Sequence, residues 1–335
     1  MLYAGVDLHL KVTQVAVVDE RGELVLNRRV RSDREELLRV FGETGPEQAL
    51  EVAFEATYGW GWFADLLEDA GIPAHMAHPR ANKAITSARV KNDAVDAKTL
   101  AHLLRTDLLP ESWIAPPPVR EGRRLVRMRT SMVRIRSRLK NQVHAIFADY
   151  GLHPTESSLF AGNNLTELCR RLPILTRKRV EANLRLIEDI DKELDLADAQ
   201  IHKLFARDAG VRRLLPIPGI GIITAAIIVA EVGDITRFPS ARHFCSWCGL
   251  TPTEHSSAEH TRRGHISKQG SRWLRWVLVE AACHSYRNRE LAVLQGNVAS
   301  RRGDKIARIA LARRLATLSF YALRNPEGCR AFPAR

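Results

Sequence analysis

Apolar and polar residues alternate along the first thirty residues, and this period of two is typical of β-strands. The alternation runs through YAGVDLHLKVTQVAVV, breaks at the turn-rich segment DERGE and resumes in ELVLNRRV. This pattern predicts three antiparallel strands. An apolar run at 49–56 (ALEVAFEA) and a shorter one at 72–76 predict two more strands, the first of them buried.

Between and after these strands the apolar period becomes that of helices. Ser32 and Glu35 form a capping box ahead of an apolar helical face, which predicts a helix start at this point. Further helices are predicted at 60–70 and from about 93 to 104. The order βββαβαβα predicts a mixed sheet covered by helices, the ribonuclease-H-like α/β arrangement, over residues 1–110.

The segment LLPESWIAPPPVR contains four prolines, which stop a helix and stiffen the chain into an extended linker. Two long helical patterns follow at 119–150 and 176–205, and together they predict an antiparallel hairpin or coiled-coil connector over 111–209. The hairpin is either an oligomerisation arm, which we favour, or a helical subdomain. A mainly α-helical domain is predicted at 210–335.

The charge balance predicts a polyanionic partner. Lys and Arg number 51 against 38 Asp and Glu, a net charge of +13, which favours nucleic acid over a membrane surface. No run of about 18 apolar residues occurs, so we expect no membrane span and a cytoplasmic, nucleoid-associated protein. The five cysteines are an odd number, so reduced thiols are expected rather than a disulfide framework.

Four acidic residues are candidates for one metal site. Asp7 lies in the first strand, Glu55 ends the strand at 49–56, and Asp93 and Asp96 are spaced i, i+3 on one helix face. Carboxylate oxygens suit Mg²⁺ (or Mn²⁺), and such a cluster is typical of phosphodiester cleavage.

Each acid also has an ordinary interpretation. Asp93 and Asp96 suit the first turn of a helix, where they interact favourably with the helix dipole, and Glu55 suits an exposed strand end. Asp7 is different, because an acid between Val6 and Leu8 in an apolar strand must face solvent or a ligand. The four together favour the metal site.

These acids stand in segments that resemble a known family. GVDLH, FEATYGW and KNDAVDAKTLA resemble, in order, the motifs of DEDD transposases of the insertion-sequence one-ten family. The resemblance implies a domain similar to RuvC-type resolvases in which Asp7, Glu55, Asp93 and Asp96 hold divalent metals. It also implies a guide RNA that pairs with donor and target DNA, and a homo-oligomer, a dimer or tetramer. GVDLH also resembles the first phosphate loop of actin-like ATPases and sugar kinases, but their glycine-rich nucleotide loops are absent.

The C-terminal part carries two further motifs. In LLPIPGIGIITAAIIVAEV, Gly219 and Gly221 precede a helix and resemble the turn of a helix-hairpin-helix element, whose backbone amides hold a phosphate; the alternative is a packing turn. GLTP, ISKQG and LRW resemble the C-terminal domain of the same transposases. That resemblance implies a serine nucleophile at Ser257, with Ser256 as the alternative, although Ala258 replaces the usual glycine.

Other residues are assigned by charge and spacing. Cys245 and Cys248 are interpreted as core thiols, and Trp273 and Trp276 as helix packing rather than base stacking. Candidate nucleic-acid contacts are Arg123, Arg127, Arg134, Arg138, Arg262, Arg263 and Lys268. A further helix is expected to carry Arg301, Arg302, Lys305, Arg308, Arg313 and Arg314.

The sequence therefore predicts an insertion-sequence transposase that cuts and rejoins DNA strands. One alternative is a structure-selective endonuclease of the resolvase type, which uses the acids alone. The other is a non-catalytic DNA-binding protein.

Overall fold

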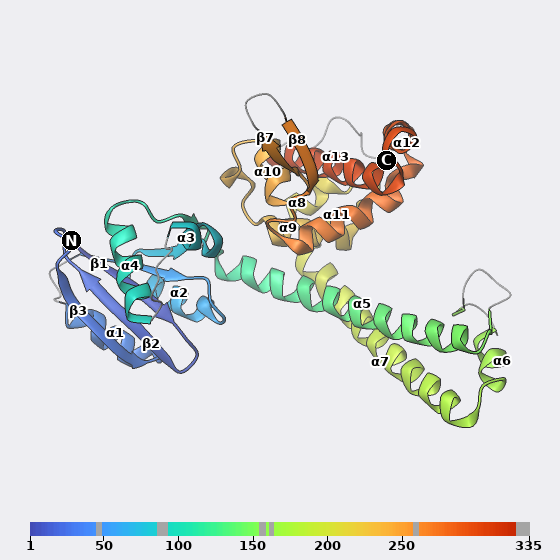
Figure 1. The fold of residues 1–335 in the computed structure, drawn as a ribbon, viewed down its shortest axis with the longest axis horizontal. Helices are drawn as coiled ribbons and strands as arrows, with labels where there is room; N and C mark the ends of the chain where they lie inside the picture. Colours follow the sequence, from blue (N-terminus) through green and yellow to red (C-terminus); the bar gives the residue numbers. More distant parts are fainter. Residues whose placement is uncertain (45–48, 86–92, 154–158, 161–163, 257–260, 326–335) are drawn as a thin grey trace. The chain divides into compact units, whose positions relative to one another are not determined.

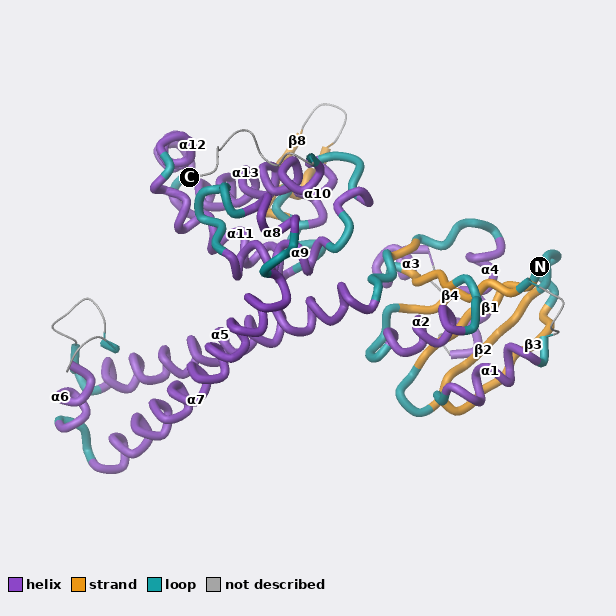
Figure 2. Tube along the Cα trace, turned by 180° about the vertical axis from the view of Figure 1, so that it is seen from behind, coloured by secondary structure: helices purple, strands orange, loops and turns teal. Residues whose placement is uncertain are grey.

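The structure is a computed structural model that describes residues 1–44, 49–85, 93–153, 159–160, 164–256 and 261–325 (Figures 1 and 2). It divides into two compact units, Met1–Pro117 and Pro118–Arg335. The division into three parts at 110 and 209 stays a prediction.

The first unit is built on a six-stranded mixed sheet. Its strands are β1 (Leu2–Leu8), β2 (Val12–Val18), β3 (Leu24–Arg31), β4 (Leu50–Glu55), β5 (Ala74–Ala77) and β6 (Glu111–Ser112), in the order β3-β2-β1-β4-β5-β6. β1, β2 and β3 pair antiparallel, whereas β1, β4 and β5 run parallel. The five predicted strands are confirmed. β6 was not predicted: it pairs with β5 inside the segment expected to be an extended linker.

In the described part of this unit the sheet is accompanied by the helices α1 (Arg34–Gly42), α2 (Trp60–Asp69), α3 (Pro79–Ile85) and α4 (Asp93–Arg105). The predicted capping box is wrong by one residue. Asp33 caps α1 by accepting from the backbone N–H of Glu36 at 2.8 Å, while the Ser32 hydroxyl donates to the His9 carbonyl at 2.7 Å. Serine and aspartate cap equally well, so the contact with His9 decides between them. α3 was not predicted.

Alternate residues of β1 face opposite layers of helices. Leu2, Ala4, Val6 and Leu8 pack in one core with residues of α1 and α2. Tyr3 packs in a second core that includes Leu100 of α4. The helices therefore lie on both faces of the sheet (Figure 1). Because strand side chains alternate, Asp7 lies on the α4 face.

Gly5 allows α4 to lie directly against β1. A Cβ atom at Gly5 would be 1.9 Å from the Ala97 carbonyl oxygen and 2.5 Å from the Ala101 backbone nitrogen. Both atoms belong to the backbone of α4, so a side chain at this position requires the helix to move. The close approach brings the start of α4 to the end of β1 that carries Asp7.

We expect Gly5→Ala to lower the free energy of unfolding by about 2–3 kcal/mol, because overpacking forces the backbone of α4 outward. Chemical denaturation followed by tryptophan fluorescence measures the change. Gly42→Ala is the matched control, since nothing lies within 4 Å of a Cβ there and alanine favours the helix. Equal stability of the two variants would contradict the close packing of α4.

The second unit begins with two long helices, α5 (Pro117–Asp149) and α7 (Ile174–Phe205), with α6 (Asn164–Arg170) between them in the chain. α5 and α7 run antiparallel: Arg129 pairs with Asp198 and Arg136 with Asp191, each at 2.6 Å. α5 starts two residues before the predicted position, because proline suits the first turn of a helix.

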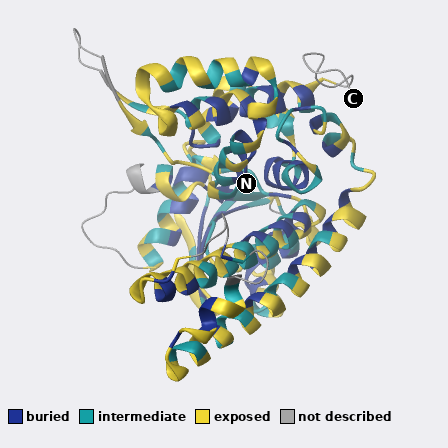
Figure 3. Cartoon of the chain, turned by 90° about the vertical axis from the view of Figure 1, so that its right-hand side faces the viewer, coloured by how far each residue is buried: buried dark blue, intermediate teal, exposed yellow. Residues whose placement is uncertain are grey.

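The rest of this unit packs around the largest of the hydrophobic cores that the described residues form. Its elements are α8 (Ala209–Leu214), α9 (Ile222–Val232), η1 (Ile235–Arg237), α10 (Ala241–Trp247), β7 (Pro252–Ser256), β8 (Thr261–Ile266), α11 (Arg272–His284), η2 (Ser285–Arg287), α12 (Arg289–Arg302) and α13 (Asp304–Arg324). Its mostly helical character matches the prediction. In Figure 3 the outward sides of many helices are exposed, whereas buried residues gather in the strands and on inward helix faces.

The surroundings of the cysteines and tryptophans test two assignments in this unit. Cys245 and Cys248 are core thiols as predicted, and burial raises the pKa of Cys245 and raises that of Cys248 well above its usual range. Trp276 packs against the core, but Trp273 does not, and the guanidinium groups of Arg134 and Arg272 lie over its ring.

The prediction of one basic helix at 301–314 is wrong. α12 ends at Arg302, Gly303 separates the helices and α13 begins at Asp304. Neither these two helices nor any other within the described ranges is both long and apolar enough to cross a bilayer.

Candidate functional site

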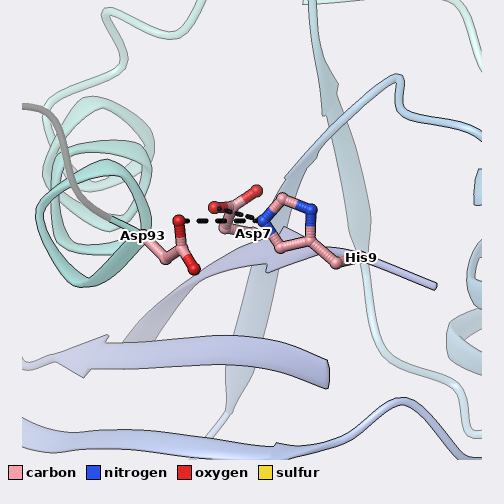
Figure 4. Close-up of side chains that lie close together, drawn as sticks. All are labelled: Asp7, His9 and Asp93. Atoms are coloured by element: carbon pink, nitrogen blue, oxygen red, sulfur yellow. Dashed lines mark hydrogen bonds and ion pairs between the residues drawn. The ribbon is translucent and has the colours of Figure 1, made fainter. Parts of the chain in front are cut away.

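Asp7, His9 and Asp93 converge at the end of β1 and the start of α4 (Figure 4). The His9 Nε2 atom lies 3.2 Å from an Asp7 carboxylate oxygen and 3.8 Å from an Asp93 carboxylate oxygen. One donor atom from each residue fits within 4.8 Å of the others. Among the described residues this is the group of three with the spacing of metal ligands, and it brings together two of the four predicted acids.

Hydrogen bonds hold the backbone beside this group. The Thr57 hydroxyl donates to the Leu8 carbonyl at 3.0 Å, and the Ser32 hydroxyl donates to the His9 carbonyl at 2.7 Å. The buried Thr13 hydroxyl lies 2.8 Å from the Ser32 hydroxyl. These contacts from three other segments fix the turn after β1, so the position of His9 is set by the fold.

Asp7 is the most enclosed acid of the group, with 9% of its surface exposed. Burial raises the pKa of its carboxyl, the charges of Asp93 and Asp96 raise it further, and His9 lowers it. Burial and the two neighbouring acids therefore disfavour the ionised form of Asp7, and the contact with His9 offsets this only in part. A bound cation relieves the repulsion between these acids.

Asp96 and Glu55 lie around the group without belonging to it. Asp96 is close enough to affect the pKa of Asp7. Val6 of β1 pairs with Phe54 of β4 in the parallel register, and Asp7 and Glu55 are the next residues of the two strands. Glu55 therefore lies level with Asp7 on the adjacent strand. Its carboxylate accepts from the side-chain amide of Asn82 at 2.7 Å.

Sequence reasoning missed His9 and Asn82. His9 follows Asp7 by two residues, and this i, i+2 spacing at a strand end was the signal for a shared face. Asn82 lies on α3, a seven-residue helix that no periodic pattern in the sequence predicted. Its position against Glu55 depends on the sheet topology, which brings the residues after β5 beside the end of β4.

We expect Asp7→Asn to stabilise the metal-free protein at neutral pH. The folded-state pKa of Asp7 is raised above its unfolded value, so ionisation above that folded pKa destabilises the native state. As the pH falls through the folded pKa towards the unfolded value of about 4, this destabilisation is lost and the advantage of asparagine shrinks. Thermal unfolding in EDTA from pH 4 to pH 8 measures the trend.

The control for this trend is Asp195→Asn, which changes an exposed acid on α7. Its stability difference from the unmodified protein is expected to stay small throughout. If Asp7→Asn were less stable than the unmodified protein at pH 8, the ionised carboxylate would stabilise the native state, contrary to this prediction.

The predicted nucleophile Ser257 and the neighbouring Ala258 lie outside the described residues. Ser256 ends β7, and Arg262 and Arg263 lie in β8, which pairs antiparallel with β7. Lys268 lies in the turn between β8 and α11, where it adopts a left-handed backbone with φ of 53°. The roles of all these residues stay predictions.

The turn with Gly219 and Gly221 lies between α8 and α9, and Gly221 is the N-cap of α9. Gly219 has a φ of +85°, and a Cβ there would be 2.4 Å from the Ala281 carbonyl oxygen, so the turn requires glycine. A cavity of about 560 Å³ adjoins this turn. Its described charged or titratable lining residues are Arg212, His284 and Arg287, none of them acidic.

The four arginines predicted on α5 have different surroundings. The Arg127 guanidinium donates two hydrogen bonds to the buried Glu231 carboxylate, at 2.6 and 2.9 Å. Arg123 donates to the Ala230 and Glu231 carbonyls. Arg134 and Arg138 are exposed. Arg123 and Arg127 therefore attach α5 to α9, and a contact with nucleic acid stays a prediction for all four.

Comparisons with known proteins agree with the motifs. Residues 4–152 match a DEDD transposase model of IS110 elements, and residues 211–295 match the model described as Transposase IS116/IS110/IS902 family. The transposase for insertion sequence element IS1328 of Yersinia enterocolitica is 26% identical over 94% of this chain and 95% of its own. The transposase for insertion sequence element IS1111A of Coxiella burnetii is 24% identical over 83% of this chain and 76% of its own.

Proposed function

Because this chain belongs to the IS116/IS110/IS902 family of insertion-sequence transposases, we propose that it cuts and rejoins DNA strands through a metal-binding acidic site and a serine nucleophile. The observation that carries the proposal is the convergence of Asp7 and Asp93 on one face of the sheet. The strand order β3-β2-β1-β4-β5, with acids ending β1 and β4, supports a ribonuclease-H-like, RuvC-like domain.

The side chains at this site fit Mg²⁺ or Mn²⁺. Asp7 and Asp93 offer carboxylate oxygens within 4.8 Å of each other, and Asp96 and Glu55 add acids beside them. Such hard oxygen donors suit these cations. Burial, and to a smaller extent the charges of Asp93 and Asp96, raise the pKa of Asp7, and a bound cation favours its ionised form. Bound there, a divalent cation supplies charge stabilisation at the phosphoryl group.

The chain's own residues carry the exchange of bonds. We assign Ser257 as the attacking hydroxyl: its oxygen bonds to phosphorus, the bond to one DNA strand breaks, and the departing strand takes up a proton. A hydroxyl of another strand then attacks the phosphoserine and restores the serine. Each step exchanges one phosphodiester for another, so no ligase is required. Arg262, Arg263 and Lys268 are proposed to contact the phosphates.

DNA is the partner that a transposase acts on. We propose that the Gly219–Gly221 turn holds a DNA phosphate, since its cavity is lined by Arg212 and Arg287. The family resemblance further suggests a guide RNA and a homo-oligomer, a dimer or tetramer, for which the α5–α7 hairpin is the candidate contact.

The test is a search for a covalent intermediate. Protein with Mg²⁺, labelled DNA carrying the element's ends and RNA from its flanks is denatured and analysed for a protease-sensitive protein–DNA adduct. The adduct is expected with the unmodified protein and with Ser256→Ala, but not with Ser257→Ala. Loss with Ser256→Ala alone would move the nucleophile by one residue. Cleavage without any adduct would favour a resolvase-type nuclease.

A further inference from the structure

The basic residues of α5 differ in the partners that the second unit gives them. Arg123 and Arg127 bond to α9, and Arg129 and Arg136 pair with acids of α7. Arg134 and Arg138 lie on the same side of α5 as Arg123 and Arg127, about three helical turns further along. The positive charge on this side of α5 therefore extends beyond the two arginines that bond to α9.

This part of α5 lines a groove of about 700 Å³ opposite α11. Its lining comprises Val133, Arg134, Ser137, Arg138, Asn141, Gln142 and Ala145 of α5, with Trp276 and Glu280 of α11. The α5 members recur at three- and four-residue intervals, so they form one stripe along the helix. Every residue of this stripe except the partly buried Val133 is exposed.

One tryptophan of α11, Trp276, lines the groove, and a second, Trp273, contacts the groove residue Arg134. The Arg134 guanidinium lies 4.5 Å from the ring centre of Trp273, and that of Arg272 lies 4.8 Å from it. These cation–π contacts hold Arg134 at the groove edge. Trp276 packs partly against the core and leaves the rest of its surface in the groove. An aromatic surface thus lies beside Arg134 and Arg138.

We propose that this groove binds a segment of single-stranded nucleic acid, with phosphates on the arginine side and a base against Trp276. Arginine suits phosphate, and an aromatic face suits an unpaired base. Asn141 and Gln142 offer amide donors and acceptors to base edges, whereas Glu280 repels phosphate and accepts from base amino groups. In a duplex the bases are stacked inside the helix, so they do not lie against Trp276. The inference deepens the proposed function and rests on it.

The experiment measures binding in EDTA by fluorescence anisotropy, with labelled (dT)12, labelled (U)12 and a labelled 12-base-pair duplex. Arg138→Ala is expected to weaken single-strand binding about fivefold and to lower the salt slope by about 0.7. Trp276→Leu is expected to weaken it roughly tenfold. Arg124→Ala is the matched control, because this exposed α5 arginine pairs with Glu121 and lies outside the groove.

Each outcome decides the proposal. Selective loss of single-strand affinity supports it, and the (dT)12 and (U)12 arms show whether DNA or RNA is preferred. If Arg138→Ala binds the single strands as tightly as Arg124→Ala does, the proposal is overturned. This comparison holds even if Trp276→Leu does not fold. An equal loss of duplex affinity also overturns the proposal, in favour of simple backbone contact. Mg²⁺-dependent cleavage by the unmodified protein is scored separately, so failure of the transposase proposal is distinguishable from failure of the groove.

Discussion

Asp93→Asn is expected to slow Mg²⁺-dependent cleavage of the element's ends about a thousandfold. The amide keeps the shape of the side chain but removes a negative charge from the group at the start of α4. Stabilisation by a bound cation is worth several kcal/mol, and about 4 kcal/mol corresponds to three powers of ten in rate. Asp93 is half exposed, with 53% of its side chain accessible, so the fold is expected to survive the change.

The measurement combines rate with metal binding. Cleavage of labelled DNA gives the rate, and the shift in melting temperature on adding Mg²⁺ reports binding without catalysis. Asp69→Asn is the control, because Asp69 is an exposed acid at the end of α2. This variant is expected to keep the cleavage rate and the Mg²⁺-induced shift in melting temperature of the unmodified protein. A variant that cleaves normally and still gains stability from Mg²⁺ would place the metal away from Asp93.

The sheet and its acidic face follow from local patterns. Alternation along β1 and β4 predicts that Asp7 and Glu55 each lie on the strand face opposite the neighbouring apolar residues. The parallel pairing of β1 with β4, which alternation does not give, brings the two acids near each other. The start of α4 is equally predictable, since two acids at i, i+3 precede an apolar face. For His9 the i, i+2 spacing from Asp7 indicates a shared face, but its contact with Asp93 depends on the turn after β1. Asn82 could not be predicted in this way, because its contact with Glu55 depends on the short helix after β5.

Charge is a weaker guide than periodicity on α5. It predicts contacts with nucleic acid for Arg123 and Arg127, yet both bond to groups more than 100 residues further along the chain. The sequence feature that indicates this contact is the acid with which Arg127 pairs. Glu231 is the one charged residue in the apolar helix IITAAIIVAEV, and a buried acid requires a partner. A count of basic residues on α5 carries no information about that partner.

Arg127→Ala is expected to lower the free energy of unfolding of the second unit by about 3–5 kcal/mol. Glu231 has 1% of its side chain exposed, and its carboxylate accepts from Arg127 and from the Ser271 hydroxyl at 2.9 Å. Removing Arg127 leaves the buried carboxylate with the Ser271 hydroxyl as its hydrogen-bond donor among the described residues and with the charge of Arg123 nearby. The loss therefore exceeds that of the contact itself. Chemical denaturation followed by circular dichroism measures the change.

Two further variants separate the pair from the helix that carries it. Arg124→Ala breaks an exposed pair with Glu121 on the same helix and is expected to change stability by less than about 0.5 kcal/mol. Arg127→Met combined with Glu231→Leu removes both charges and is expected to recover much of the loss, because an apolar pair avoids the burial of an unpaired carboxylate. If the double variant is as unstable as Arg127→Ala, packing at this position rather than the charge of Glu231 holds α5 to α9.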